Sequence, residues 1–170
     1  MELDDYIRMI PDFPKPGVIF KDITTLLASK EASAVCLERL LTLVGDQPID
    51  KVVGIESRGF FFGMLLAQRL NAGFVPVRKP GKLPSSTLKE PYELEYGMDV
   101  LEIHDDAITK GERILIHDDV LATGGTARAA CNLVEKLGGN IVQCNFIMEL
   151  LFLDGKDKLR KYEVASALQY

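Results

Sequence analysis

The amino-acid sequence predicts an α/β fold with a mostly parallel central sheet flanked by helices. Between residues 29 and 148, short aliphatic runs of strand length alternate with longer segments of helical periodicity. This alternation is typical of parallel sheets, because each crossover between parallel strands carries a helix that covers one face. With 170 residues, the chain is long enough to bury one hydrophobic core, so we expect a single domain.

The first half of the chain supplies two helices and two strands. From Ser29 to Val44, apolar residues follow the i, i+3, i+4 spacing of an amphipathic helix. Lys51 to Ile55 predicts a short buried strand, and Phe74 to Val77 predicts the next one. Between these strands, Gly59 to Leu70 is apolar on nearly every side, which predicts a largely buried helix.

Residues 79 to 99 have a different character. Lysines, prolines and serines lead into the aromatic and acidic sequence PYELEYGMD, and no helical periodicity is present. We expect a long loop here, and long loops in compact domains are usually functional or disordered. Val100 to Ile103 then resumes strand character.

The last third of the chain repeats the strand and helix pattern. Ile114 to Ile116 predicts a strand that ends near His117. Ala127 to Leu137 predicts an amphipathic helix, which Gly138 and Gly139 end. Ile141 to Met148 predicts a further strand.

The junction ILIHDDVLATGGTA, residues 114 to 127, is the strongest candidate for a ligand site. Asp118 and Asp119 fall at the carboxyl edge of the predicted strand, where parallel sheets bind ligands. Ala122 to Thr126 forms the turn into the next helix. Small residues let the backbone approach an anion, and the free N–H groups of a first helical turn favour a phosphate. We therefore expect a phosphate to bind at this turn.

The acid pair narrows the class of ligand. Carboxylates accept hydrogen bonds from vicinal hydroxyl groups, or hold a metal ion that bridges to the ligand, so a sugar phosphate fits. No GK[ST] follows the glycines and no GxGxxG is present, so neither a Walker A motif nor a dinucleotide is indicated. A Gly-Gly turn before a helix is also common as turn chemistry, so the interpretation depends on the acids and the strand-to-helix context.

The composition limits which binding partners and which cellular compartment we expect. The 20 basic and 25 acidic residues give a net charge of -5, which argues against binding nucleic acid but permits local basic clusters. No apolar segment is long enough to cross a bilayer, and the N-terminus MELDDYIRMI does not resemble a secretory signal. Cys36, Cys131 and Cys144 form no CxxC pair. We expect no membrane association, a cytoplasmic location and buried free thiols.

The sequence DDVLATGGT, residues 118 to 126, resembles the signature with which type I phosphoribosyltransferases bind 5-phosphoribosyl 1-pyrophosphate (PRPP). Four further segments narrow the resemblance to the adenine phosphoribosyltransferases: PGVIFKDIT at 16 to 24, GIESRGFFFG at 54 to 63, VRKPGKLP at 77 to 84 and LEYG at 94 to 97. The resemblance covers nearly the whole chain, with the segments in the family's order. It implies transfer of a phosphoribosyl group from PRPP to N9 of adenine, giving AMP and pyrophosphate with Mg²⁺.

The resemblance also implies the architecture and the PRPP site. It implies a type I phosphoribosyltransferase fold with a small N-terminal hood at about residues 1 to 30, a flexible catalytic loop at about 80 to 99, and a homodimer. Asp118 and Asp119 match the ribose ligands, and Ser57 and Arg58 match the pyrophosphate loop, where the family has a non-proline cis peptide. Mg²⁺ is expected to be held through PRPP, pyrophosphate and water without a direct protein ligand. The segment that matches the 5′-phosphate loop consists of Ala122, Thr123, Gly124, Gly125 and Thr126.

A basic cluster precedes the predicted loop. The cluster consists of Arg78, Lys79 and Lys82, and it has two interpretations. It is either a solvated run of charge or a set of cations that stabilise the leaving pyrophosphate, whose charge grows in the transition state. In the family, the residue that matches Arg78 reaches the neighbouring subunit's site. Tyr96, in LEYG, is a further candidate PRPP or AMP ligand.

Glu95 and Arg58 are the expected catalytic residues. An exposed loop glutamate is usually inert, but the resemblance places Glu95 near N7 of adenine, where a carboxyl group can handle the purine proton as N9 attacks. The transition state should resemble an oxocarbenium ion, so closure of the loop would protect it from water.

The expected adenine site comprises Ile19, Phe20, Lys21 and Leu150. Phe20 would stack on the purine, although it could also be a core residue. The backbone of Ile19 and Lys21 would read the purine edge and reject a 6-oxo purine, whose donor and acceptor are reversed. Lys21 replaces an arginine that many relatives have, which is tolerated if only its backbone contacts adenine.

His117 stands where relatives more often have an apolar residue. A structural histidine is the favoured interpretation, and tuning of the adjacent acids is the alternative.

Two rival functions remain at this stage. A phosphoribosyltransferase for an oxo-purine would share the PRPP loop and differ in the hood and in LEYG. A PRPP-binding regulator would add a DNA-binding module or lack catalytic-loop residues. The chain is acidic, has no added module and retains Glu95 with the basic cluster, so the enzyme is favoured.

Overall fold

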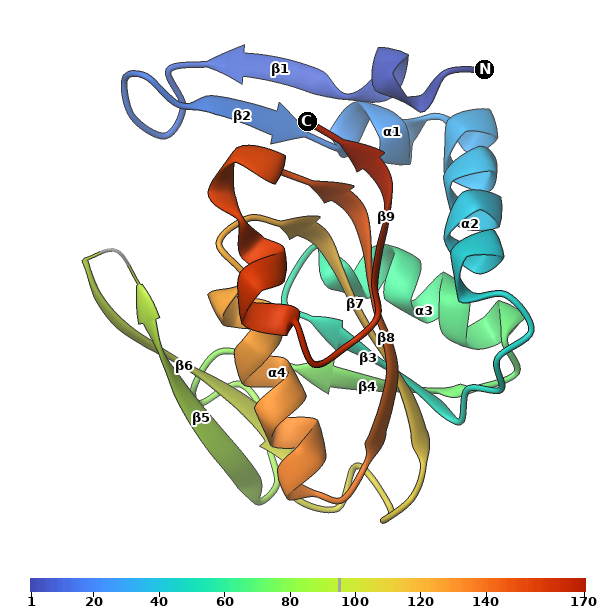
Figure 1. Cartoon of the computed structure of the whole chain (residues 1–170), viewed down its shortest axis with the longest axis vertical. Helices are drawn as coiled ribbons and strands as arrows, with labels where there is room; N and C mark the ends of the chain where they lie inside the picture. Colours follow the sequence, from blue (N-terminus) through green and yellow to red (C-terminus); the bar gives the residue numbers. More distant parts are fainter. Residues whose placement is uncertain (95) are drawn as a thin grey trace. The chain divides into compact units, whose positions relative to one another are not determined.

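The computed structural model describes residues 1–94 and 96–170. The chain forms two compact units, Met1–Arg39 and Leu40–Tyr170, and each is described by itself. The first unit contains the 3-10 helix η1 (Leu3–Tyr6), strands β1 (Arg8–Pro11) and β2 (Ile19–Asp22), helix α1 (Thr24–Ala28) and most of helix α2 (Lys30–Val44) (Figure 1). β1 and β2 pair in antiparallel fashion, with Ile10 opposite Phe20. The helix expected from Ser29 to Val44 is confirmed.

The second unit is built on a five-stranded sheet in the order β4-β3-β7-β8-β9. These strands are β3 (Lys51–Ile55), β4 (Gly73–Val77), β7 (Arg113–Leu121), β8 (Asn140–Glu149) and β9 (Val164–Gln169). Every neighbouring pair is parallel, which confirms the predicted fold class. β9 was not anticipated from the sequence.

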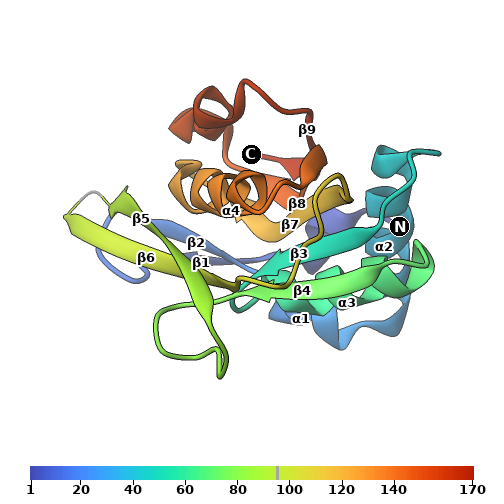
Figure 2. The same ribbon diagram turned by 90° about the horizontal axis from the view of Figure 1, so that it is seen from below.

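Helices α3 (Gly59–Arg69) and α4 (Gly125–Lys136) lie on opposite faces of this sheet (Figure 2). The buried aliphatic residues of β3, β4 and β7 pack with the apolar face of α4 into one hydrophobic core cluster. Between β8 and β9 the chain forms two short 3-10 helices, η2 (Leu151–Leu153) and η3 (Gly155–Leu159). No helix of the described residues is both long and apolar enough to span a membrane.

The segment expected to be a long loop is largely a β-ribbon. β5 (Thr87–Leu94) pairs in antiparallel fashion with β6 (Gly97–His104), and among the described residues of this segment 79 to 86 and 96 lie outside regular strands and helices. The ribbon forms because one side of it is buried: Leu101 and Ile103 are fully buried and Tyr92 is 8% exposed. Polar residues between these positions hide the pattern in the sequence. The expected loop is therefore wrong for residues 87 to 94 and 97 to 99.

The expected burial of the second helix is also wrong. In α3, Phe62 and Leu66 are fully buried, but Phe61, Met64 and Leu65 are 50%, 56% and 40% exposed. A helix on a sheet face buries only the stripe that contacts the sheet. The apolar residues on the other side of α3 therefore remain at the surface of this chain.

β7 is longer than expected. We expected the strand to end near His117, but pairing with β8 continues as far as Leu121, with Asp118 opposite Phe146 and Val120 opposite Met148. Asp118 and Asp119 therefore lie within the strand. The partner strand supplies the hydrogen bonds that hold the acidic segment extended, and no local pattern reveals that partner.

Gly54 of β3 packs closely against Phe74 of β4 and the start of α3, and its replacement tests that packing. A Cβ atom on Gly54 would lie 2.6 Å from Phe74 Cε2 and 3.0 Å from the Gly59 carbonyl oxygen. We predict that Gly54→Ala lowers the free energy of unfolding by about 1–3 kcal/mol, because the core is overpacked. Gly73→Ala is the matched control in the adjacent strand, since its Cβ would meet Lys51 Cγ at an ordinary 3.4 Å. Urea denaturation measures both, and equal effects would contradict this account.

Candidate active site

The predicted phosphate loop lies between the end of β7 and the start of α4. Gly124, the N-cap residue of α4, has φ 85°, a left-handed conformation that favours glycine. A Cβ atom on Gly124 would overlap with the carbonyl oxygen of Gly155, so the two backbone segments are in contact. Glycine offers no side chain to cap α4, so the first-turn N–H groups remain suited to an anion.

The acid pair and the pyrophosphate loop meet at Arg58. The Arg58 Nε–H donates to Asp119 Oδ2, and the Asp119 N–H donates to Asp118 Oδ1 at 2.8 Å. The start of α3 packs against the end of β7 here, because a Cβ atom on Gly59 would lie 2.9 Å from Asp118 Oδ1. Burial and the neighbouring Asp119 charge raise the pKa of Asp118 well above its ordinary value. The fold thus joins two segments that the sequence singled out separately.

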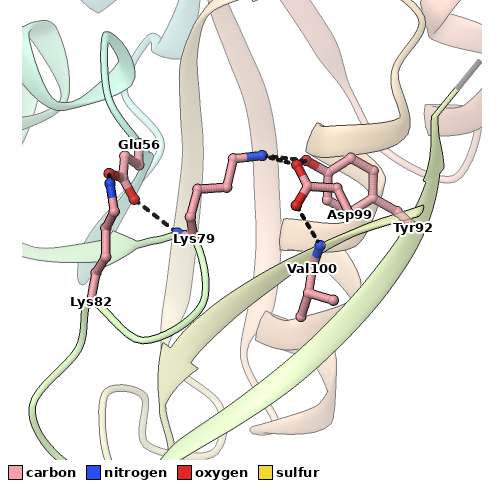
Figure 3. Close-up of polar contacts among 6 residues, drawn as sticks. All are labelled: Glu56, Lys79, Lys82, Tyr92, Asp99 and Val100. Atoms are coloured by element: carbon pink, nitrogen blue, oxygen red, sulfur yellow. Dashed lines mark hydrogen bonds and ion pairs between the residues drawn. The ribbon is translucent and has the colours of Figure 1, made fainter. Parts of the chain in front are cut away.

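Glu56 organises the basic cluster (Figure 3). Its carboxylate accepts hydrogen bonds from the Lys79 N–H at 2.8 Å and Lys82 Nζ at 2.6 Å. It also accepts a hydrogen bond from Arg78 Nη2 at 3.2 Å. Burial by itself would raise the pKa of Glu56, but these donors outweigh burial and lower the pKa to about 2. The peptide bond between Glu56 and Ser57 is cis, as the family resemblance implied.

Lys79 joins the basic cluster to the β5–β6 ribbon. Its ammonium pairs with Asp99 Oδ2 and donates to the Tyr92 hydroxyl at 2.8 Å, and that hydroxyl donates to Asp99 Oδ2 at 3.1 Å (Figure 3). Burial of Lys79 would lower its pKa, but the Asp99 and Tyr92 hydrogen bonds raise it. The Lys79 hydrogen bond lowers the pKa of Asp99.

Sequence reasoning missed Glu56, Tyr92 and Asp99 as members of this site. Glu56 directly precedes Ser57 and Arg58, so a carboxylate beside a predicted anion site was a usable signal. Tyr92 and Asp99 face each other across the ribbon, and only the strand register reveals their proximity.

The predicted adenine residues are found in both units. Ile19, Phe20 and Lys21 lie on β2 of the first unit, where Ile19 is 60% exposed. The Phe20 ring meets Phe13 edge to face at 5.2 Å between centroids, and it is only partly buried. Leu150 follows β8 in the second unit, and its N–H donates to the Leu121 carbonyl oxygen at 2.9 Å.

The predicted catalytic residue belongs to the segment LEYG, residues 94 to 97. Glu95 lies outside the described residues. The adjacent Tyr96 is 84% exposed, and Leu94 and Met98 beside it are 50% and 61% exposed.

His117 is buried on β7 and hydrogen-bonds to Asn145. The Asn145 amide donates to the Leu40 carbonyl and to Gln143 Oε1, so its oxygen accepts from His117 Nδ1 at 3.1 Å. Burial lowers the pKa of His117 to about 4, so the ring is neutral at pH 7. These contacts support the structural interpretation of His117.

Within the described residues, no group of three or more His, Cys, Asp or Glu side chains is placed to hold a metal ion. The Asp118–Asp119 pair is the acidic feature nearest to the phosphate loop in the sequence, and it could contact a metal ion that the substrate carries.

Comparisons with known proteins agree with this geometry. The family model for the phosphoribosyl transferase domain matches residues 22–168. The adenine phosphoribosyltransferase of Flavobacterium johnsoniae is 64% identical over 170 residues, covering all of both chains. The crystal structure of adenine phosphoribosyltransferase from Thermoanaerobacter pseudethanolicus superposes with a TM-score of 0.96, at 50% identity, covering 99% of this chain and 100% of that one. The Saccharomyces cerevisiae enzyme, in complex with an imino-altritol bisphosphate and adenine, has a TM-score of 0.91 at 42% identity, with 96% and 95% coverage.

The low pKa of Glu56 makes its contribution to stability depend on pH. Ionised Glu56 stabilises the folded state fully above its ordinary value of 4.5, and this contribution is lost as pH falls toward about 2. We therefore predict that Glu56→Gln is less stable than the parent at pH 7, and that the difference shrinks between pH 5 and pH 2. Chemical denaturation at several pH values measures it. A difference that stays constant across this range would contradict the assignment.

Proposed function

The chain belongs to the phosphoribosyl transferase family, and we infer that it transfers the 5-phosphoribosyl group of PRPP to N9 of adenine, forming AMP and pyrophosphate. The observation that carries this function is the junction of β7 and α4. There, two acids on the strand precede a glycine turn and the N-terminus of a helix. This arrangement offers acceptors for ribose hydroxyl groups and donors for the 5′-phosphate.

We propose that Asp118 and Asp119 bind the ribose hydroxyl groups and that residues 122 to 126 bind the 5′-phosphate. The contact between Arg58 and Asp119 supports this proposal, because it sets a cation of the pyrophosphate loop beside the ribose acids. In PRPP, the ribose lies between the 5′-phosphate and the 1-pyrophosphate. The ribose acids therefore stand where both ends of the substrate can be held.

The leaving pyrophosphate would bind to Ser57, Arg58, Arg78, Lys79 and Lys82. The cations of this set already pair with Asp119, Glu56 and Asp99, so a polyanion could replace those carboxylates as their partner. Donors fixed where negative charge develops stabilise the transition state more than the ground state. We propose that Mg²⁺ enters with PRPP and neutralises part of the pyrophosphate charge.

Adenine would bind to Ile19, Phe20, Lys21 and Leu150. We propose that the β2 backbone reads the 6-amino group and N1, so that a 6-oxo purine leaves a donor and an acceptor unpaired. Glu95 would handle the purine proton near N7, and Tyr96 would close over the substrate. The exposed apolar side chains of Leu94 and Met98 on the ribbon support a role of this segment in excluding water.

We further propose a cytoplasmic homodimer. The exposed Phe61, Met64 and Leu65 share one face of α3, and contiguous exposed apolar side chains of this kind mark interaction surfaces. Each of the three cysteines is buried and free, which fits a reducing compartment. Arg78 pairs with Glu56 of its own chain. A contact of Arg78 with the neighbouring subunit's site would therefore be additional to this ion pair.

Product formation from PRPP and Mg²⁺ with adenine, hypoxanthine, guanine or xanthine tests the function. We predict that the protein forms AMP from adenine and no product from the other bases, and that turnover stops when Mg²⁺ is chelated. In Glu95→Ala, we expect the rate to fall to about one hundredth of the parent rate or below. Glu93→Ala, at an exposed glutamate two residues before Glu95 in the sequence, is the matched control and should retain activity. Turnover only with an oxo-purine would overturn the adenine site. Tight PRPP binding without turnover of any base would indicate a regulator.

Sedimentation equilibrium tests the homodimer. We predict that Met64→Lys shifts the protein toward monomer, because a charge would be buried unpaired at the interface. Phe152→Lys, at a side chain 72% exposed on η2, is the control and should leave the dimer intact. A monomeric parent protein, or a dimer that survives Met64→Lys, would overturn the proposed interface.

A further inference from the structure

The segment between β8 and β9 packs directly on the phosphate loop. A Cβ atom on Gly155 would overlap with the carbonyl oxygen of Ala122, as one on Gly124 would overlap with the carbonyl oxygen of Gly155. Figure 1 shows η3 beside the start of α4, and residue contacts join the two elements. The backbone of η3 is therefore fixed against residues 122 to 124.

Lys158 extends from this fixed segment toward the first turn of α4. The flanking Gly155 and Leu159 are buried, so the backbone of Lys158 is held at both ends while its side chain remains exposed. Its Nζ atom lies 3.8 Å from the position that a Cβ atom on Gly125 would occupy. Gly125 is the first residue of α4, so the ammonium group stands at the helix N-terminus.

The charge pattern around Lys158 sets it apart from its neighbours. Lys156 pairs with Glu149 at 2.9 Å, Arg160 with Asp157 at 3.1 Å and Lys161 with Glu135 at 2.8 Å. In the part of the chain that the structure describes, Lys158 forms no hydrogen bond or ion pair. Among these four cations, Lys158 is thus the one without a counter-charge from the described residues, and it is the one that lies at the phosphate loop.

The phosphate loop needs such a cation. Residues 122 to 126 are uncharged, and the two acids that precede them on β7 are negative. A 5′-phosphate is a dianion at neutral pH, and the partial charge of one helix terminus offsets only about half an elementary charge. The ammonium group of lysine has three hydrogen-bond donors and a full positive charge, and its flexible stem lets it adjust to the position of a phosphate.

We propose that Lys158 binds the 5′-phosphate of the substrate directly and is a specificity-determining residue for phosphorylated ribose. This inference rests on the proposed function. The 5′-phosphate keeps its charge throughout phosphoribosyl transfer, so Lys158 stabilises the bound substrate and the transition state alike. Its loss should raise the KM for PRPP and leave kcat nearly unchanged.

The test compares Lys158→Gln with Arg160→Gln. Both remove one positive charge from the same exposed segment, and Arg160 pairs with the exposed Asp157. Calorimetry measures the binding of ribose 5-phosphate and, separately, of pyrophosphate with Mg²⁺. We expect Lys158→Gln to weaken ribose 5-phosphate about tenfold and to leave pyrophosphate within about twofold of the parent. Lys158→Arg should restore most of the affinity, and Arg160→Gln should bind both ligands as the parent does.

Three results would overturn the proposal: equal affinities for ribose 5-phosphate in the two glutamine variants, an equal loss of both ligands in Lys158→Gln, or a fall in kcat with an unchanged KM. Thermal melting of each variant separates loss of binding from loss of folding. A parent protein that binds neither ligand and does not use PRPP would refute the proposed function itself. A parent that uses PRPP, with Lys158→Gln equal to the control, would refute only the role of Lys158.

Discussion

The site depends on the neutralisation of its cations by carboxylates of the same chain. Arg58 pairs with Asp119, Lys79 with Asp99, and both Arg78 and Lys82 with Glu56. These cations are 33% to 49% exposed, so removing a carboxylate would leave like charges close together at a partly solvated surface, which is unfavourable. The carboxylates therefore allow a polyanion site to fold before the polyanion arrives. They also set its affinity, because a substrate must compete with them for each cation.

The same ion pairs connect parts of the chain that are distant in sequence. Lys79, just after β4, is held by Asp99 on the β5–β6 ribbon, so the basic cluster and the ribbon cannot move independently. The ribbon is held at a second point by Glu90, which pairs with Lys136 and accepts a hydrogen bond from Asn132 on α4 at 3.0 Å. Leu94 at the end of β5 and Met98 near the start of β6 are exposed. The ribbon is therefore held to the basic cluster and to α4 at two separate points.

The features that could be predicted from the sequence are those that depend on interactions between residues close together in the chain. The phosphate turn is local, since its small residues and its position before a helix are contiguous, and the structure forms that turn as expected. The end of β7 is not local, because β8 decides how far the strand continues past His117. The ribbon depends on pairing between residues such as Tyr92 and Asp99, and the exposed face of α3 depends on what covers it. Glu56 escaped notice because its three donors come from a segment more than 20 residues away, as the separations of 22, 23 and 26 residues show.

The glycines at 124 and 155 explain why the phosphate loop cannot be understood from its own motif alone. A side chain at either position would overlap with the backbone of the other segment. The turn before α4 therefore keeps its shape only while η3 packs against it. Glycine is required at position 124 for two reasons: its φ of 85° is left-handed, and a side chain there would overlap with the Gly155 backbone. The contact that shapes the turn also fixes the segment carrying Lys158, whose neighbour Leu159 is fully buried. The excursion between β8 and β9 is therefore a structural part of the phosphate site, and the charge that it carries stands where the loop itself supplies none.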